Sequence, residues 1–417
     1  MRLPYRATFL TAAAATVVAA AVALPAAAAT GSAATETGRS AATTEHTMLK
    51  VKRVGTLKNG KPKYAEATPT GLPPSAVQSV YNLSGLSSSS GAGAGQIIAI
   101  VDAYHDANAL SDLNEFNTQY GYAKLSTCTS LTQSGACFEQ THPGSTTPKS
   151  NSGWALEESL DIEWAHAEAP AAKIVLVEAT SSSNSALYSA VSYANSLDAT
   201  EVSMSWGGSE SSSESSNDSY FTHSGTLYTV SAGDSGHGLE YPAASPNVVG
   251  VGGTTLNGCS GTSCSGTVTE TTWTGGSGGV SADETIPSYQ SGYTGSVYGA
   301  STISVLTGGH RGVPDVSFVG NPNTGVSVYD STAYEGQSGW FTLGGTSVGA
   351  PNWAGILAAG AAAGSTALQG TAAIYSGGYQ TNLRDITSGT NGSCGTDCTA
   401  GVGYDLVTGL GSPINYP

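Results

Sequence analysis

Ser347 is the residue in this chain whose surroundings best fit a nucleophile. It lies in Gly344-Gly345-Thr346-Ser347-Val348-Gly349-Ala350-Pro351, ahead of an alanine-rich stretch, 352–363, that is typical of a helix. Glycines permit a sharp turn, and a proline is tolerated in the first turn of a helix because the first amides have no intrahelical partner. A hydroxyl at such a corner faces the positive end of the helix dipole, which stabilises developing negative charge. An ordinary helix-capping serine has a similar local sequence.

A serine nucleophile requires a base, and two carboxylic residues could form one. Glu157 and Asp161 occur in Trp154-Ala155-Leu156-Glu157-Glu158-Ser159-Leu160-Asp161, four residues apart, and therefore share one face of a helix. Two carboxylates so placed repel each other unless they share a proton, which raises one pKa and creates a base hydrogen-bonded to an orienting partner. The same spacing is also typical of a solvated acidic helix face.

An acid at the end of a strand could stabilise the oxyanion of acyl transfer. Asp234 follows the apolar residues of Val230-Ser231-Ala232-Gly233-Asp234-Ser235-Gly236. An ionised aspartate would repel an oxyanion, whereas a protonated one donates a hydrogen bond worth about 3 kcal/mol, by analogy with other oxyanion donors. Aspartates that close turns in glycine-rich loops give the same pattern.

Alternating apolar strands and amphipathic helices must position these groups. The expected strands are 97–101, 173–178, 201–206, 227–231 and 248–252, and the expected helices are 154–168, 185–197 and 352–363. This alternation predicts an α/β fold with a mostly parallel sheet and helices on both faces. Ligands bind such sheets beyond the carboxyl ends of the strands. The pattern continues from Gly71 without a linker or repeat, so we expect one domain over 71–417.

The three segments, in this order, resemble the sedolisins, a family of serine-carboxyl peptidases with a subtilisin-like fold. The resemblance implies that Ser347 is the nucleophile, that Glu157 is the general base, that Asp161 orients it and that Asp234 stabilises the oxyanion. Ser205-Trp206-Gly207-Gly208 is similar to the family's substrate-binding strand, which implies that Ser205, Trp206 and Gly207 contact the substrate. Activity that requires a neutral Asp234 is expected in acid and should fall as the pH rises.

The resemblance also implies one calcium ion near the C-terminus. Arg384-Asp385-Ile386-Thr387 and Ala400-Gly401-Val402-Gly403-Tyr404-Asp405 are similar to the family's calcium site. The implied ligands are the side chains of Asp385 and Asp405 and the carbonyl groups of Ile386, Gly401 and Gly403. Such an oxygen-only set suits a hard cation. Without the resemblance, these would be two turn aspartates in a glycine-rich loop.

The first 70 residues differ in composition from the rest. Residues 1–29 combine a basic start, an apolar middle and small residues at the end, which predicts a signal peptide and a secreted protein. Residues 30–70 lack an apolar period and are interpreted as a short pro-segment or linker, whereas most sedolisins carry a long folded pro-domain.

Cysteines and charges narrow the possible partners. The cysteines form three close pairs, Cys128/Cys137, Cys259/Cys264 and Cys394/Cys398, for which local disulfides are favoured over zinc. Nine of the 14 Lys and Arg residues precede Thr70 in a chain of net charge −16, so nucleic acid is not an expected partner. We expect a monomer that acts on polypeptides and has no membrane span.

Two other functions stay open from the sequence. A neutral subtilisin-like hydrolase would use Asp102, a histidine such as His105 or His237, and Ser347, although no HGT-like motif is present and Asp102 is interpreted as a strand-end capping residue. A secreted binding protein without catalysis would keep the same fold.

Overall fold

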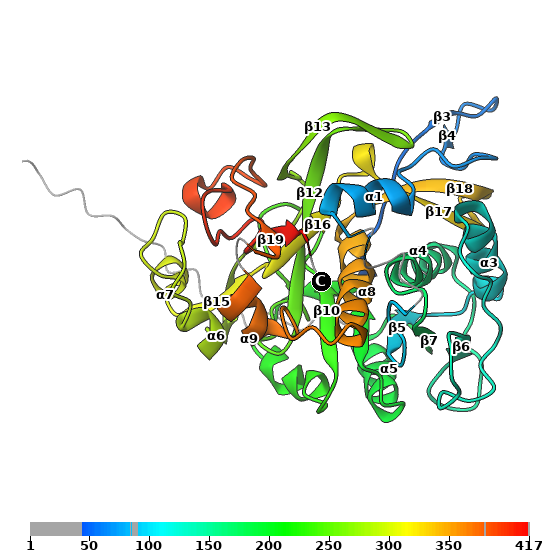
Figure 1. The fold of residues 1–417 in the computed structure, drawn as a ribbon, viewed down its shortest axis with the longest axis horizontal. Coiled ribbons are helices and arrows are strands. Elements are labelled where there is room, and N and C mark those ends of the chain that lie inside the picture. Colours follow the sequence, from blue (N-terminus) through cyan, green and yellow to red (C-terminus); the bar gives the residue numbers. More distant parts are fainter. Residues whose placement is uncertain (1–43, 84, 86–90, 379–380, 416–417) are drawn as a thin grey trace, which may run out of the picture. The chain divides into compact units, whose positions relative to one another are not determined.

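A parallel seven-stranded sheet runs through the centre of the protein, with an antiparallel hairpin at one edge (Figure 1). The hairpin forms because β12 continues past its parallel neighbours and pairs with β13 (Ser263–Thr272). The parallel strands, in spatial order, are β6 (Phe138–Thr141), β7 (Lys173–Ala179), β5 (Ile97–Ala103), β8 (Glu201–Met204), β10 (Leu227–Ser231), β12 (Val249–Ser260) and β16 (Val316–Val319).

This computed structural model describes residues 44–83, 85, 91–378 and 381–415. All of them belong to one compact unit, 38–417. The predicted signal peptide, 1–29, lies outside the described residues. Among the described helices, none is long and apolar enough to cross a membrane.

Helices cover both faces of the sheet because the strand side chains alternate. In β5, Ile98 and Ile100 pack on the side of α3 (Ala109–Tyr120), α4 (Ser152–Glu168) and α8 (Gly349–Ala362). Ala99 and Val101 point to the other side, toward α5 (Asn184–Ser196). In Figure 1, the orange α8 stands between β10 and α4, and it contacts both. The predicted α/β class, with a mostly parallel sheet and helices on both faces, is confirmed.

Shorter elements surround the sheet. Near its carboxyl edge, β9 pairs with both β1 and β11, and β18 pairs with both β17 and β2. These elements are β1 (His46–Thr47), β2 (Lys50–Val51), β3 (Gly55–Thr56), β4 (Pro62–Lys63), α1 (Pro74–Tyr81), β9 (Trp206–Ser209), β11 (Glu240–Tyr241), β14 (Gly279–Thr285), α6 (Ser288–Ser291), α7 (Ile303–Thr307), β15 (His310–Val313), β17 (Val326–Tyr334), β18 (Gln337–Gly344), α9 (Thr371–Ala373), β19 (Leu383–Arg384) and β20 (Ser412–Pro413).

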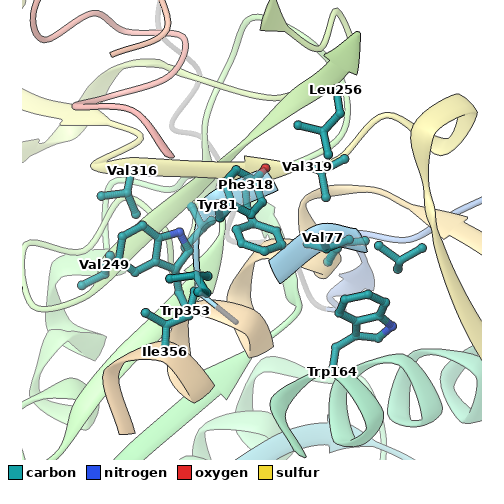
Figure 2. Packing of buried hydrophobic residues seen from close by; sticks show 14 of the residues in the cluster. Val77, Tyr81, Trp164, Val249, Leu256, Val316, Phe318, Val319, Trp353 and Ile356 are labelled. Atoms are coloured by element: carbon teal, nitrogen blue, oxygen red, sulfur yellow. The ribbon is translucent and has the colours of Figure 1, made fainter. Parts of the chain in front are cut away.

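Aromatic packing fixes α8 against the sheet (Figure 2). Trp353 of α8 is fully buried, and its indole N–H donates to the carbonyl oxygen of Ser317, 3.2 Å away. Across the same cluster the rings of Tyr81 and Phe318 lie 4.5 Å apart. Truncating a buried tryptophan of this kind to alanine typically costs about 3 to 5 kcal/mol of stability. The start of α8, which directly follows the turn that carries Ser347, is therefore held firmly.

The predicted elements all exist, and apart from shifts of one or two residues at their ends three of them differ from the prediction. The strand expected over 201–206 is two strands, β8 and β9, that are separated at Ser205. The strand expected at 248–252 extends to Ser260 because of the hairpin. The helix expected to begin at 352 begins at Gly349, after a 3-10 turn over Thr346–Val348.

The three predicted disulfides are present, and each closes a short loop. The bond between Cys259 and Cys264 staples the β12–β13 hairpin, where the two cysteines are register partners. The other two pairs are Cys128–Cys137 and Cys394–Cys398.

Candidate active site

Ser347 lies where β18 turns into α8. Gly345 has φ of +99°, which L side chains rarely adopt, and a Cβ there would meet the carbonyl oxygen of Met48 at 2.1 Å. The turn therefore requires glycine. Ser347 is fully buried, and its hydroxyl lies 3.5 Å from the carbonyl oxygen of Ser205.

Helix α4 carries the two predicted acids of the base. The helix begins after Asn151, whose side chain accepts hydrogen bonds from the amides of Gly153 (2.9 Å) and Trp154 (3.2 Å). Glu157 and Asp161, one turn apart, are both fully buried. They do not form a solvated acidic face.

Glu157, Asp161 and Ser347 interact electrostatically. Burial raises the pKa of Glu157 well above its ordinary value, and the Asp161 carboxyl raises it further, whereas the Ser347 hydroxyl lowers it. Burial also raises the pKa of Asp161, while the side chains of Ser205 and Glu157 lower it. Neither Glu157 oxygen has a hydrogen bond of ordinary geometry to the residues that the structure describes. The serine and glutamate are thus near each other in an arrangement that can tighten when a substrate binds.

Asp102 belongs to the same group of acids, and its interpretation as a strand-end cap is wrong. It lies inside β5, and its carboxyl oxygens form no hydrogen bond with the described part of the chain. Burial and then the neighbouring Glu178 raise its pKa to about 8. The Asp102 carboxyl in turn raises the pKa of both Glu157 and Asp161. It therefore helps to keep protons within the pair.

Asp234 follows β10 and faces the turn before Ser347. Its Oδ1 accepts hydrogen bonds from the amide (2.7 Å) and the hydroxyl (3.0 Å) of Thr346. Its Oδ2 has no hydrogen-bond partner within the described ranges. Burial raises its pKa to about 7, although the hydrogen bonds from Thr346 lower it. The carboxyl is therefore mostly neutral below about pH 6, with Oδ2 placed to carry the proton.

An extended segment of the chain, 44–52, occupies the space beside Ser347. Its first half pairs with β9 and its second half with β18. Between them, the Met48 amide donates to the carbonyl oxygen of Ser205 and the Ser347 amide donates to the carbonyl oxygen of Met48, both over 3.1 Å. The strand predicted to bind substrate, Ser205-Trp206-Gly207, thus binds extended backbone. The indole of Trp206 is buried and donates to the carbonyl oxygen of Val101, so it supports the strand from behind.

Residues 44–52 and Thr346 are the parts of this site that sequence reasoning missed. The segment lies in the region interpreted as a pro-segment or linker, and its two-residue strands are too short for a periodic pattern. Thr346 directly precedes Ser347, so its position beside the candidate nucleophile could have been predicted from the sequence.

Neither candidate histidine interacts with Ser347. The imidazole Nδ1 of His105 lies 2.9 Å from the Glu178 carboxyl, at the ends of β5 and β7. The backbone of His237 pairs with Asn391 and with Gly278. A histidine base for Ser347 has no support in these contacts.

The predicted calcium ligands share one loop system. Asp405 is buried, and its carboxylate accepts hydrogen bonds from the amides of Gly401 (2.9 Å) and Thr408 (2.8 Å). The carboxylate of Asp385 accepts from the amide of Gly403 over 2.9 Å. The carbonyl oxygen of Ile386 approaches the Thr408 hydroxyl at 3.5 Å. This oxygen-only donor set fits a hard cation such as calcium.

The fold and this site define a class of protein. The profile described as "Subtilase family" matches residues 146–369, which include Glu157, Asp161, Asp234 and Ser347. The chain therefore belongs to the subtilase family.

Relatives narrow the resemblance to the sedolisin type. Sedolisin from Pseudomonas sp. (strain 101) is 27% identical over 89% of this chain and 64% of its own length. Kumamolisin from Bacillus sp. (strain MN-32) is 32% identical over 62% of this chain and 49% of its own. The solved structure of Pseudomonas sedolisin, described as a serine-carboxyl proteinase complexed with two molecules of pseudo-iodotyrostatin, covers 83% of this chain and 96% of its own, with 27% identity and a TM-score of 0.65.

These relatives confirm the predicted resemblance to the sedolisins and the subtilisin-like fold. The chain spans about 64% of the length of sedolisin and about half of the length of kumamolisin.

Proposed function

We propose that this protein is a serine-carboxyl endopeptidase that cleaves polypeptides at acidic pH through an acyl-enzyme on Ser347. The observation that carries the proposal is the meeting of Ser347 with the Glu157–Asp161 pair on one side and with Asp234 on the other, next to strands that hold extended backbone. The relationship to sedolisin and kumamolisin supports it.

In this mechanism Glu157 takes the proton of the Ser347 hydroxyl as its oxygen attacks the scissile carbonyl carbon. Asp161 orients Glu157, and the two buried carboxyl groups share one proton. Glu157 then protonates the leaving amine, and the acyl-enzyme is hydrolysed by a water that the same glutamate activates. The oxyanion is stabilised by the Ser347 amide and by protonated Asp234.

Acidic operation follows from the need for a neutral Asp234. An ionised carboxylate would repel the oxyanion, so activity should fall as the pH rises through the pKa of about 7 that burial gives Asp234. Endo-action is supported by the backbone pairing of residues 44–52 with β9 and with β18. The polypeptide thus extends past Ser347 on both sides of the bond nearest to it.

We also propose that the loop system of Asp385 and Asp405 binds one calcium ion. The carbonyl groups of Ile386, Gly401 and Gly403 would complete the ligand set, as the family resemblance implies. The ion would stabilise the C-terminal loops and supply no step of the reaction. Secretion and a monomeric state are further proposals, which rest on the sequence of residues 1–29 and on the family.

The proposal is tested by cleavage of a denatured protein substrate from pH 3 to pH 8, with the Ser347→Ala variant as the control. Cleavage confined to acid and lost in the variant is expected. A maximum near neutral pH would favour a histidine base instead. Absence of cleavage at every pH would favour a binding protein, provided that residues 1–48, part of which occupies the space beside Ser347, have been removed from the preparation.

A further inference from the structure

Residues 44–52 run extended along β9 and β18 and pass Ser347, as a substrate of the proposed peptidase would have to do. In the part of the segment before Met48, the Glu45 amide donates to the carbonyl oxygen of Ser182 (2.7 Å), and β1 pairs antiparallel with β9. In the part after Met48, β2 pairs antiparallel with β18, and the Lys52 amide donates to the carbonyl oxygen of Thr342 (2.9 Å). The segment changes from one partner strand to the other between Thr47 and Lys50, beside Ser347.

The carbonyl group of Met48 lies where an oxyanion would form. Its oxygen accepts a hydrogen bond from the Ser347 amide over 3.1 Å. The position that a Cβ of Gly345 would take lies 2.1 Å from this oxygen and 2.6 Å from Oδ2 of Asp234. The Met48 oxygen therefore shares one small space with two groups proposed to stabilise the oxyanion, and the Met48–Leu49 peptide bond is the one presented to Ser347.

The side chain of Met48 fills a pocket next to the catalytic turn. It is fully buried, and its sulfur lies 3.7 Å from the hydroxyl oxygen of Thr346. Its terminal carbon lies only 2.4 Å from the position that a Cβ of Gly207 would occupy. The missing side chain at Gly207 thus provides the depth that an unbranched residue as long as methionine needs.

The residues after Met48 also enter a built cleft. Leu49 and Val51 border a cavity of about 470 Å³ whose other walls include Tyr64, Trp273 and Tyr334. Before Met48, the imidazole of His46 lies 3.3 Å from the Glu240 carboxylate. The segment is therefore held by side chains as well as by backbone on both sides of the Met48–Leu49 bond.

We propose that the chain cleaves its own Met48–Leu49 peptide bond, as an intramolecular first substrate, and that the pocket beside Gly207 selects methionine-like residues before the scissile bond. This rests on the proposed function. The Ser347 oxygen forms an ester with the Met48 carbonyl carbon, the C–N bond breaks, and the nitrogen of Leu49 leaves as an amine after receiving the proton that Glu157 took from the serine. Water then hydrolyses the ester, which gives a Met48 carboxyl group and regenerates Ser347. No other reactant is needed.

The experiment follows the full chain by intact mass and N-terminal peptide mass spectrometry after a shift from pH 7.5 to pH 4. A denatured protein substrate is present in parallel samples. We expect a new N-terminus at Leu49, formed at a rate that does not change over a tenfold range of protein concentration. The Ser347→Ala chain should keep the Met48–Leu49 bond, also when it is mixed with a trace of wild-type protein.

One variant inside the segment and one outside it test the pocket. Met48→Val, which places a branched side chain in a pocket fitted to an unbranched one, should slow cleavage at least tenfold. Lys58→Gln, in the exposed turn between β3 and β4, should leave the rate unchanged. Thermal unfolding of each variant shows whether it has folded.

The two proposals fail in different ways. Degradation of the protein substrate with an intact Met48–Leu49 bond, or with a cut at another bond of 44–52, overturns this inference and leaves the proposed function standing. If the Ser347→Ala protein is cut at this bond without added wild type, a host protease makes the cut and the inference is overturned. A cleavage rate that rises with protein concentration also overturns the inference, because the reaction is then intermolecular. A wild-type chain that cleaves neither itself nor the substrate contradicts both.

Discussion

The amide of Ser347 donates a hydrogen bond to the carbonyl oxygen of Met48 over 3.1 Å. The nucleophile's own backbone therefore holds a peptide carbonyl in position before any reaction, as expected of a preorganised oxyanion site. The second member of that site is Asp234, which is anchored through Oδ1 to Thr346 and leaves Oδ2 without a partner in the described structure. The donor that this oxygen can provide exists only while the carboxyl is protonated.

Replacement of Asp234 tests this proton directly. Asp234→Asn keeps the acceptor for Thr346 and places an N–H donor where Oδ2 was, at every pH. We expect some loss of kcat/KM at pH 4 but disappearance of the decline that wild type shows as the pH rises through about 7. Asp234→Ala removes the donor and should cost about 10²-fold to 10³-fold in kcat. An unchanged alkaline decline in Asp234→Asn would assign it to another group.

The general base can be separated from its buried neighbours with a matched pair of variants. Glu157→Gln should lose about 10²-fold to 10⁴-fold in kcat, because an amide cannot accept the serine proton. Glu158→Gln is the control: Glu158 is equally buried on the same helix, and burial likewise raises its pKa, but its neighbours are the acids Glu178, Asp102, Asp106 and Asp330 and not the Ser347 hydroxyl. Activity should change only a few-fold in this control. Equal losses in both variants would point to a structural effect of α4.

Short-range patterns predicted the strands, the helices and the placement of Ser347, Glu157, Asp161 and Asp234. The position of each of these residues follows from a local turn or from helix spacing. The alternation of strands and helices brings all four to one edge of the sheet. Asp102 was misinterpreted because its burial depends on α4 and β7, which are distant in sequence. The segment 44–52 was missed because it binds mainly through its backbone, whose hydrogen bonds leave no mark on the sequence.

Gly207 should determine which residue fits before the scissile bond. A Cβ at Gly207 would lie 2.4 Å from the end of a methionine in the pocket. Gly207→Ala should therefore lower the ratio of kcat/KM for peptides with Met over peptides with Ala at that position by roughly tenfold. Gly55→Ala is a suitable control, because a Cβ there meets only the Lys63 side chain, at 3.8 Å. A ratio unchanged in Gly207→Ala would place the pocket elsewhere.

Calcium binding should be visible as thermal stability. If the loops of Asp385 and Asp405 bind calcium, an ion present at 100 times its Kd stabilises the fold by about 2.7 kcal/mol, so a chelator should lower the Tm of a domain of this size by roughly 3 to 4 °C. The Ser347→Ala background prevents self-digestion during the measurement. Asp405→Asn should start from a lower Tm and should not respond to the chelator. A wild-type Tm that is indifferent to the chelator would count against the ion.

Stability should be greatest in acid, because burial raises the pKa of many carboxyl groups in this fold. Glu201, on β8 and 2% exposed, is a clear case: burial raises its pKa to about 8, although the Thr200 hydroxyl lowers it. Above its ordinary pKa of 4.5, the unfolded chain loses this proton while the folded chain keeps it, so stability falls with rising pH until about pH 8. The loss between pH 4 and pH 7 is on the order of 3 kcal/mol for this one group.

Urea unfolding of the Ser347→Ala protein from pH 4 to pH 7 measures that decline. In Glu201→Gln, whose side chain is neutral at every pH, the free energy of unfolding should decline less steeply over this range. Glu115→Gln on the exposed face of α3 serves as the control and should follow the parent curve. Because the raised pKa values of Asp102 and Asp330, both about 8, act in the same direction, the parent should still lose stability toward neutral pH when Glu201 is removed. A parent protein that is more stable at pH 7 than at pH 4 would refute the assignment of these buried carboxyl groups as neutral.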